Sequence, residues 1–220
     1  MLGARNNPKQ SLKSGATRLR DSERTRKRLL QAASGEIYRS GFQSASLDTI
    51  LAVAGVTKGA LYYHFKSKEA LGYAVVEEVI APIVYGQWVR PLQGVKDPID
   101  ALIDAVRRLP VRAQDVQGGC RLNNLAQEMS LLDAGFRKRL ALIFDTWRQA
   151  VAFTLREGQT HGSVRREVEP AEAASLLIAM VEGYGSLAKN AQDPKLMKAG
   201  IRNIVDWLQS LRTAGNRKRV

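Results

Sequence analysis

Apolar residues recur at intervals of three and four positions through most of the chain, which is the spacing of an amphipathic helix. No stretch shows the strict alternation of apolar and polar residues that is typical of a strand. The apolar stripes of the first two predicted helices consist of Leu29, Leu30, Ala33 and Ile37, and of Leu47, Ile50, Leu51 and Ala54. The pattern therefore predicts an all-α fold.

Residues that commonly begin or end helices stand between these stripes. Gly41 and Gly55 follow the stripes directly, and glycine readily adopts the left-handed conformation that ends a helix. The hydroxyl groups that can cap the next three helices belong to Ser46, Thr57 and Ser67. The spacing predicts a first helix over about 22–40, two short helices after it and a fourth that begins at Lys68.

The second half of the chain contains three prolines that each follow an acidic residue, at Asp97-Pro98, Glu169-Pro170 and Asp193-Pro194. Proline is favoured at the first helical position, and the preceding carboxylate can act as N-cap. The pairs predict helices over about 98–109, 170–190 and 194–212. A long helix is predicted over 133–157, with Gly158 at its end and with one apolar face made of Phe136, Leu140, Ile143, Phe144, Trp147 and Val151.

The charge of the chain is concentrated at its two ends. The 220 residues carry a formal net charge of +13, and residues 1–30 hold nine basic residues against two acidic ones. A charge of this sign and size favours a polyanionic partner. We expect a basic flexible arm over 1–21, a head over 22–67, a body over 68–212 and a basic tail over 213–220.

Several classes of protein are disfavoured by what the sequence lacks. Cys120 is the only cysteine, and His64 and His161 are far apart, so no zinc site or internal disulfide is expected. No apolar run approaches the length of a membrane span and no signal peptide is evident, which predicts a cytoplasmic protein with no membrane partner. We also find no phosphate-binding loop and no Ser/His/Asp order, so we expect no enzyme, cofactor or metal site.

The segment after residue 46 carries the strongest chemical signal. A tight turn over residues 55–57 joins the second and third helices, which predicts a helix-turn-helix. If Leu61 and Phe65 face the core, the outward positions of the third helix are Lys58, Gly59, Ala60, Tyr62, Tyr63 and His64. Lysine, tyrosine and histidine can donate hydrogen bonds to phosphates or base edges, and Gly59 and Ala60 allow close approach to a duplex.

Residues 25–71, and above all Ser46 to Leu71, closely resemble the DNA-binding head of the TetR (tetracycline repressor-like) transcription regulators. The resemblance implies a homodimer that binds a palindromic operator in double-stranded DNA, and a small-molecule effector in the body that releases a repressor. It places DNA contacts at Thr57, Lys58, Gly59, Tyr62, Tyr63 and His64, phosphate contacts at Thr49 and Lys68, and a variable base-preference position at Ala60.

The resemblance also suggests that helices near 170–190 and 194–212 form half of a four-helix bundle across a two-fold axis. The first of them is rich in small residues that permit close packing. The alternative is a hairpin that packs only within its own chain.

Effector-site candidates are the large apolar or amphipathic residues and polar anchors of the body, namely Trp88, Cys120, Asn124, Met129, Phe144, Trp147, Met180 and Tyr184. Cys120 lies beside Arg121 and just before a helix start, where a thiolate is favoured, so release by modification of Cys120 is a second hypothesis. The alternatives are plain core packing for these residues and an inert buried thiol.

Two further questions stay open at this level. The basic segment from Arg5 to Arg20 either enters an adjacent minor groove or is a solvated tail. The whole protein could also be a dimeric ligand- or protein-binding module whose head reads no specific DNA sequence.

Overall fold

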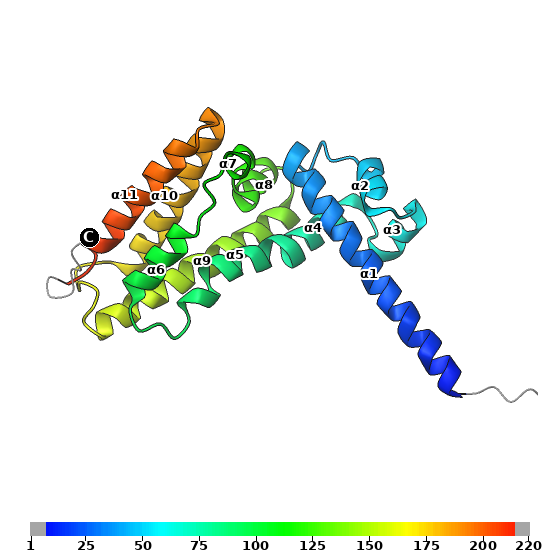
Figure 1. Ribbon diagram of the computed structural model, residues 1–220, viewed down its shortest axis with the longest axis horizontal. Coiled ribbons are helices and arrows are strands. Elements are labelled where there is room, and N and C mark those ends of the chain that lie inside the picture. The colour runs from blue at the N-terminus through cyan, green and yellow to red at the C-terminus, as the bar shows by residue number, and fades with distance from the viewer. Residues whose placement is uncertain (1–7, 214–220) are drawn as a thin grey trace, which may run out of the picture. The chain divides into compact units, whose positions relative to one another are not determined.

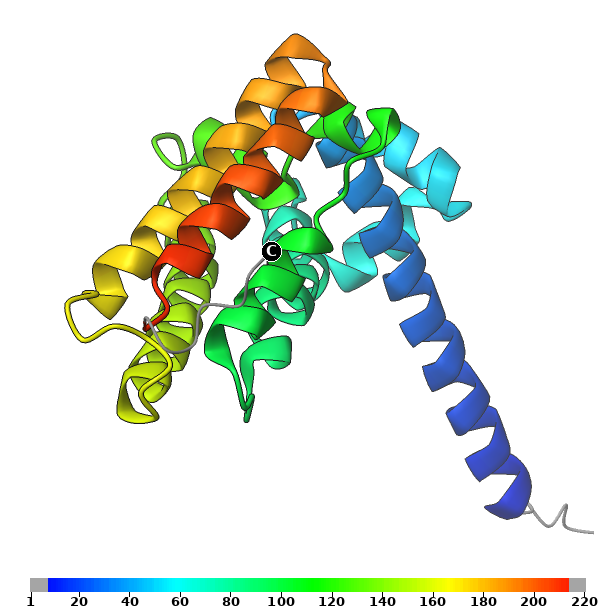
Figure 2. The same cartoon turned by 60° about the vertical axis from the view of Figure 1, so that its left-hand side comes forward.

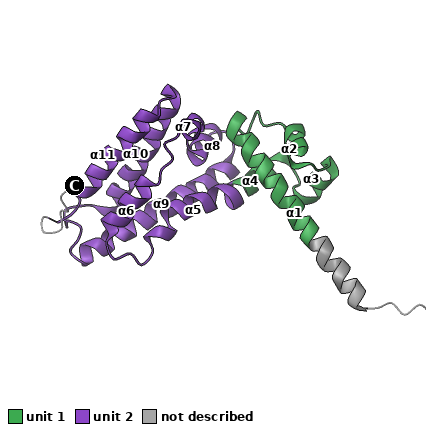
Figure 3. Cartoon of the chain, in the orientation of Figure 1, with its two compact units in different colours: residues 1–75 green, residues 76–220 purple. Residues whose placement is uncertain are grey.

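The computed structural model describes the backbone of residues 8–213 and the side chains of residues 20–213. The chain divides into two compact units, residues 1–75 and 76–220, which Figure 3 shows in different colours. The described residues are helical apart from turns and one isolated β-bridge, which confirms the predicted all-α fold. The predicted arm over 1–21 and tail over 213–220 lie almost wholly outside the described side chains, so both stay predictions.

Unit 1 is built on a long first helix. It consists of α1 (Pro8–Ser40), α2 (Leu47–Ala54), α3 (Lys58–His64) and α4 (Lys68–Val75). The helix α1 packs against each of the other three. The predicted apolar stripes form the core of this unit, in which the side chains of Leu29, Ala33, Ile50, Leu61, Phe65 and Leu71 are buried.

Unit 2 is a bundle around one long central helix. Its elements are η1 (Val76–Ile80, a π-helical turn), α5 (Ala81–Trp88), η2 (Arg90–Leu92), α6 (Pro98–Arg107), α7 (Ala113–Gly118), α8 (Arg121–Met129), α9 (Ala134–Thr160), α10 (Pro170–Ala191) and α11 (Pro194–Ser210). Figures 1 and 2 both show α10 and α11 side by side and antiparallel, and α9 also packs against α10. Among the described residues, no helix has the length and apolar character needed to cross a membrane.

One predicted helix end and one predicted capping hydrogen bond are wrong. Gly158 lies inside α9, which runs on to Thr160. A Cβ atom at Gly158 would lie 2.5 Å from Cγ2 of Val164, so this glycine permits a close approach of the following loop. Glu169 precedes α10 but its side chain makes no capping hydrogen bond, whereas Asp97 and Asp193 both cap as predicted. The helix α1 also begins earlier than expected, at Pro8.

A buried ion cluster joins the end of α11 to the start of α6. The guanidinium of Arg212, whose side chain is fully buried, donates to Asp97 at 2.7 Å and also to Asp100. Asp97 accepts hydrogen bonds from the N–H groups of Ile99 and Asp100 as well. Burial acts to raise the pKa of Asp97, but the hydrogen bonds from Arg212 and the Asp100 N–H outweigh it and lower the pKa.

Candidate DNA-binding and effector sites

The turn between α2 and α3 is set by local hydrogen bonds. Oγ of Ser46 accepts from the N–H of Thr49 at 3.3 Å, and Oγ1 of Thr57 accepts from the N–H of Ala60 at 3.3 Å. Gly55 ends α2 with φ of 60°, a left-handed conformation that favours glycine. The N-cap and C-cap assignments made from the sequence at these three positions are therefore confirmed, and they orient α3 relative to α2.

Two side chains of α1 tie that helix to the ends of α2. Nη2 of Arg28 donates to the carbonyl oxygen of Gly55 at 3.2 Å, and a Cβ on Gly55 would lie 2.6 Å from that nitrogen. At the other end, the Glu36 carboxylate accepts from Arg39 at 2.6 Å and from the Ser46 N–H at 3.4 Å. The hydrogen bond from Arg39 lowers the pKa of Glu36. Sequence reasoning missed both residues, although a polar residue near an apolar stripe was the available signal for Glu36.

The outer face of α3 is open to solvent, as the helix-turn-helix prediction requires. Leu61 and Phe65 are buried, whereas the side chains of Tyr62 and Tyr63 are 46% and 79% exposed. The other predicted contact residues at α3 are exposed or half-buried, namely Thr57, Lys58, Gly59, Ala60 and His64, and Thr49 of α2 is half-buried. The fold therefore leaves these hydroxyl, ammonium and imidazole groups accessible on unit 1.

Two members of the predicted DNA-contact set also have partners within the protein. The ring of His64 meets that of Tyr63 edge-on, with 5.0 Å between ring centroids, and burial and the nearby Arg26 charge lower the pKa of His64. A neutral imidazole at pH 7 donates one N–H. Nζ of Lys68 donates to the carbonyl oxygen of Gln43 at 2.9 Å and lies 5.1 Å from the centroid of the Phe42 ring. Lys68 thus holds the loop before α2, and its ammonium group has further N–H groups that can donate to a phosphate.

Three of the predicted effector-site residues form one aromatic stack in unit 2. The rings of Trp88 and Trp147 stack with 4.6 Å between centroids, and Phe144 lies 6.5 Å from Trp147. Nε1 of Trp147 is buried without a hydrogen-bond partner among the described residues. Met129 is buried and Met180 half-buried.

The polar effector candidates have partners on neighbouring helices. Oδ1 of Asn124 accepts from Nζ of Lys189 at 2.9 Å, and the Asn124 amide donates to the Gly118 carbonyl oxygen at 2.7 Å. The Tyr184 hydroxyl accepts from the Asn203 amide at 2.8 Å. These bonds hold α8 and α11 against α10.

The environment of Cys120 differs from the sequence expectation. Cys120 does precede the helix α8, but burial raises the pKa of its thiol to about 12, with a further contribution from the nearby Glu182 carboxylate. Burial raises the pKa of Glu182 as well. The expectation that this position favours a thiolate is wrong, because desolvation and a neighbouring acid outweigh the hydrogen bonds from the backbone N–H groups of Leu122 and Asn123 at the helix start.

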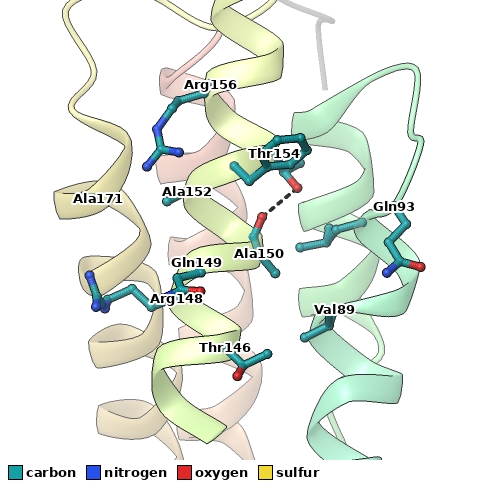
Figure 4. A pocket seen from close by; sticks show the side chains of 12 residues that line it. Val89, Gln93, Thr146, Arg148, Gln149, Ala150, Ala152, Thr154, Arg156 and Ala171 are labelled. Carbon is teal, nitrogen blue, oxygen red and sulfur yellow. Dashed lines mark hydrogen bonds between the residues drawn. The ribbon is translucent and has the colours of Figure 1, made fainter. Parts of the chain in front are cut away.

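The body contains an open pocket of about 600 Å³ along α9. Figure 4 shows Arg148 and Arg156 on the side of α9 that faces Ala171 of α10, and Val89 and Gln93 on the other side. Oγ1 of Thr154 donates to the Ala150 carbonyl oxygen within this wall. None of the eight predicted effector-site residues lines this pocket. The sequence did not indicate it, because its lining combines polar, small and large apolar residues from the α5–η2 segment, α9 and α10 in no pattern that is visible along the chain.

The capped helix-turn-helix with an exposed recognition helix, followed by a separate helical body, defines a DNA-binding transcriptional regulator. Comparison with known proteins identifies the family. Residues 29–75 match the family described as "Bacterial regulatory proteins, tetR family", and residues 96–204 match "Tetracyclin repressor-like, C-terminal domain". The chain belongs to the TetR family of transcription regulators, which are not enzymes as a family.

Individual relatives agree with this assignment. The HTH-type transcriptional repressor DhaR of Mycobacterium sp. (strain GP1) is 32% identical over 164 residues, which are 72% of this chain and 79% of DhaR. The transcriptional regulator AcuR of Cereibacter sphaeroides is 28% identical, with 68% of this chain and 69% of AcuR covered. The crystal structure of a TetR transcriptional regulator from Chloroflexus aurantiacus has 28% identity and a TM-score of 0.79, and covers 89% of this chain and all of the other.

Proposed function

We propose that the protein is a repressor that binds a palindromic operator as a homodimer in the cytoplasm and is released by a small-molecule effector. In this proposal Lys58, Tyr62 and Tyr63 read base edges or adjacent phosphates, and Thr49 and Lys68 hold the flanking backbone. The observation that carries the proposal is the exposed face of α3, on which two large aromatic side chains remain in solvent while Leu61 and Phe65 fill the core. The hydroxyl groups of these exposed tyrosines are free to donate to phosphate oxygens or base edges.

The proposed dimer interface lies on α10 and the adjacent edge of α11. Leu176 and Leu187 of α10 are 47% and 58% exposed, and Gly183 between them is exposed too. The Tyr184–Asn203 hydrogen bond joins α10 to α11, and the proposed interface extends from α10 onto α11 at this point. A second copy of the chain would cover these apolar side chains in a four-helix bundle, and a two-fold axis would match the symmetry of a palindrome.

The effector in this proposal is a small molecule held by the body. Two positions are candidates for its site. One is the Trp88–Trp147 stack, where the indole N–H of Trp147 has no hydrogen-bond partner among the described residues, and the other is the pocket along α9. The alternative route, modification of Cys120, requires a thiolate that the raised pKa of this residue disfavours.

The test is DNase footprinting on the DNA upstream of the protein's own gene, followed by titration of Lys58→Ala. If Lys58 reads a base, the variant should lose about 1–3 kcal/mol of binding free energy and change base preference at one position. A uniform loss across sequences would assign Lys58 to phosphate. Lys138→Ala, an exposed lysine of α9, is the control. Absence of a protected palindrome at every salt concentration would reject the proposal and favour a ligand- or protein-binding module.

A further inference from the structure

A basic groove separate from the recognition helix lies between α1 and the end of α2. It has a volume of about 450 Å³ and is lined by Arg24, Lys27, Arg28, Gln31 and Ala32 of α1 and by Val53 and Ala54 of α2. Positions 24, 27, 28 and 31 have the spacing of one face of a helix. None of these seven residues belongs to the predicted DNA-contact set.

The groove holds three cations and no acid. Arg24, Lys27 and Arg28 are exposed, and no carboxylate lines the groove. Neither Arg24 nor Lys27 has an ion-pair partner among the residues whose side chains the structure describes. Like charges placed this close repel one another, and an anion bound in the groove would offset that repulsion. The floor is apolar, because Ala32 and Ala54 are buried and Val53 is 65% exposed.

We propose that this basic groove binds the sugar–phosphate backbone of DNA beside the segment that α3 contacts, as a sequence-independent clamp. The inference rests on the proposed DNA contacts of α2 and α3. Thr49 and Val53 are four residues apart on α2, Thr49 half-buried and Val53 exposed, so the groove begins one helical turn from a proposed phosphate contact.

The dimensions and chemistry of the groove fit a DNA strand. From Arg24 to Gln31 the helix rises about 10 Å, which corresponds to roughly three base-pair steps along the axis of a duplex. The two arginines and the lysine supply charged donors for phosphate oxygens, and the deoxyribose carbons can pack on Val53. Arg28 is already oriented by its hydrogen bond to the Gly55 carbonyl oxygen. An acidic protein segment is the competing occupant, but the groove lies on the unit that binds DNA.

The test is the salt dependence of binding to a random 30-base-pair duplex, measured by fluorescence anisotropy for the full chain. The double variant Arg24→Gln/Lys27→Gln removes two charges and keeps polar side chains of similar reach. The matched control is Arg165→Gln/Arg166→Gln, which removes two exposed charges from the loop before α10. Arg28 is left intact because it also supports the turn after α2.

The proposal predicts that the slope of log K against log salt becomes less steep by about 1.5–2 in the groove variant, since each lost phosphate contact changes it by about 0.9. Affinity at 0.1 M salt should fall roughly tenfold or more. The control should keep the slope of the parent protein. An unchanged slope in the groove variant, or an equal change in both variants, would overturn the proposed role of the groove. The proposed DNA binding by α3 would not be affected by that result. If the parent protein binds no duplex, the proposed function itself fails.

Discussion

At the scale of single residues, the local role of a side chain could be predicted from the sequence more easily than its tertiary surroundings. The capping roles of Ser46 and Thr57 follow from local chemistry, because the acceptor and the N–H lie within three residues of each other. The state of Cys120 does not follow in this way, because the Glu182 carboxylate comes from α10, over sixty residues away. Its pKa depends on that distant packing, which no local pattern reveals.

The ion cluster at Arg212 gives a prediction at the same scale. Asp97→Asn keeps an N-cap for α6 but removes the charge that faces Arg212, and we expect it to lower the free energy of unfolding by about 1–2 kcal/mol. Asp97→Ala removes the cap as well and should cost about 1 kcal/mol more. Urea unfolding of the three proteins at pH 7 measures both steps.

The lowered pKa of Asp97 fixes how this effect depends on pH. A carboxylate with a folded pKa below its ordinary value of 3.8 stabilises the fold fully above that value. The contribution is lost as the pH falls through the lower, folded pKa. The difference between the parent protein and Asp97→Asn should therefore be constant from pH 7 to 5 and shrink below about pH 4. A difference that persists unchanged to pH 3 would show that the charge of Asp97 contributes no stability.

At the scale of elements, two helical glycines allow helix stability and DNA contact to be tested separately. A Cβ at Gly35 of α1 meets no atom within 4 Å, and one at Gly59 of α3 meets only Oγ1 of Thr57, at 3.9 Å. Because alanine is the better helix former, Gly35→Ala should raise the free energy of unfolding by up to about 1 kcal/mol, and Gly59→Ala should raise it by less, near the helix start. Only Gly59 faces the proposed duplex.

We therefore expect Gly35→Ala to leave operator affinity unchanged and Gly59→Ala to weaken it several-fold, because the added methyl group would stand between α3 and the DNA. Thermal unfolding and anisotropy titration with the footprinted operator measure the two effects. Equal operator affinity in both variants would indicate that the backbone of α3 does not approach the duplex at Gly59.

The elements themselves were largely predictable, because each begins and ends with residues whose preferences are local. The Asp97-Pro98 and Asp193-Pro194 pairs begin α6 and α11 as expected. Gly158 lies inside α9, although a glycine at the end of an apolar stripe commonly ends a helix. In the folded chain, the side chain of Val164 occupies the space that a Cβ atom at Gly158 would need, and only the tertiary structure shows this contact.

At the scale of the whole molecule, the proposed function requires a second copy of the chain, and exposed apolar residues allow the position of that copy to be tested. Leu187 of α10 is 58% exposed on the proposed interface, whereas Leu131, which is 95% exposed, lies in the turn between α8 and α9 and on neither interface helix. A charge buried in an interface without a partner costs several kcal/mol, whereas the same charge in solvent costs little. Leu187→Glu should therefore yield monomers, and Leu131→Glu should not.

Light scattering after size-exclusion chromatography gives the mass of each variant, and circular dichroism verifies that the helices are retained. Loss of the dimer should also weaken binding to the full palindrome far more than binding to a half-site, because two linked heads gain affinity from their effective concentration. A dimeric Leu187→Glu would place the interface elsewhere on the body. A monomeric Leu187→Glu with full palindrome affinity would show instead that each head binds its half-site independently and that operator binding does not require the dimer.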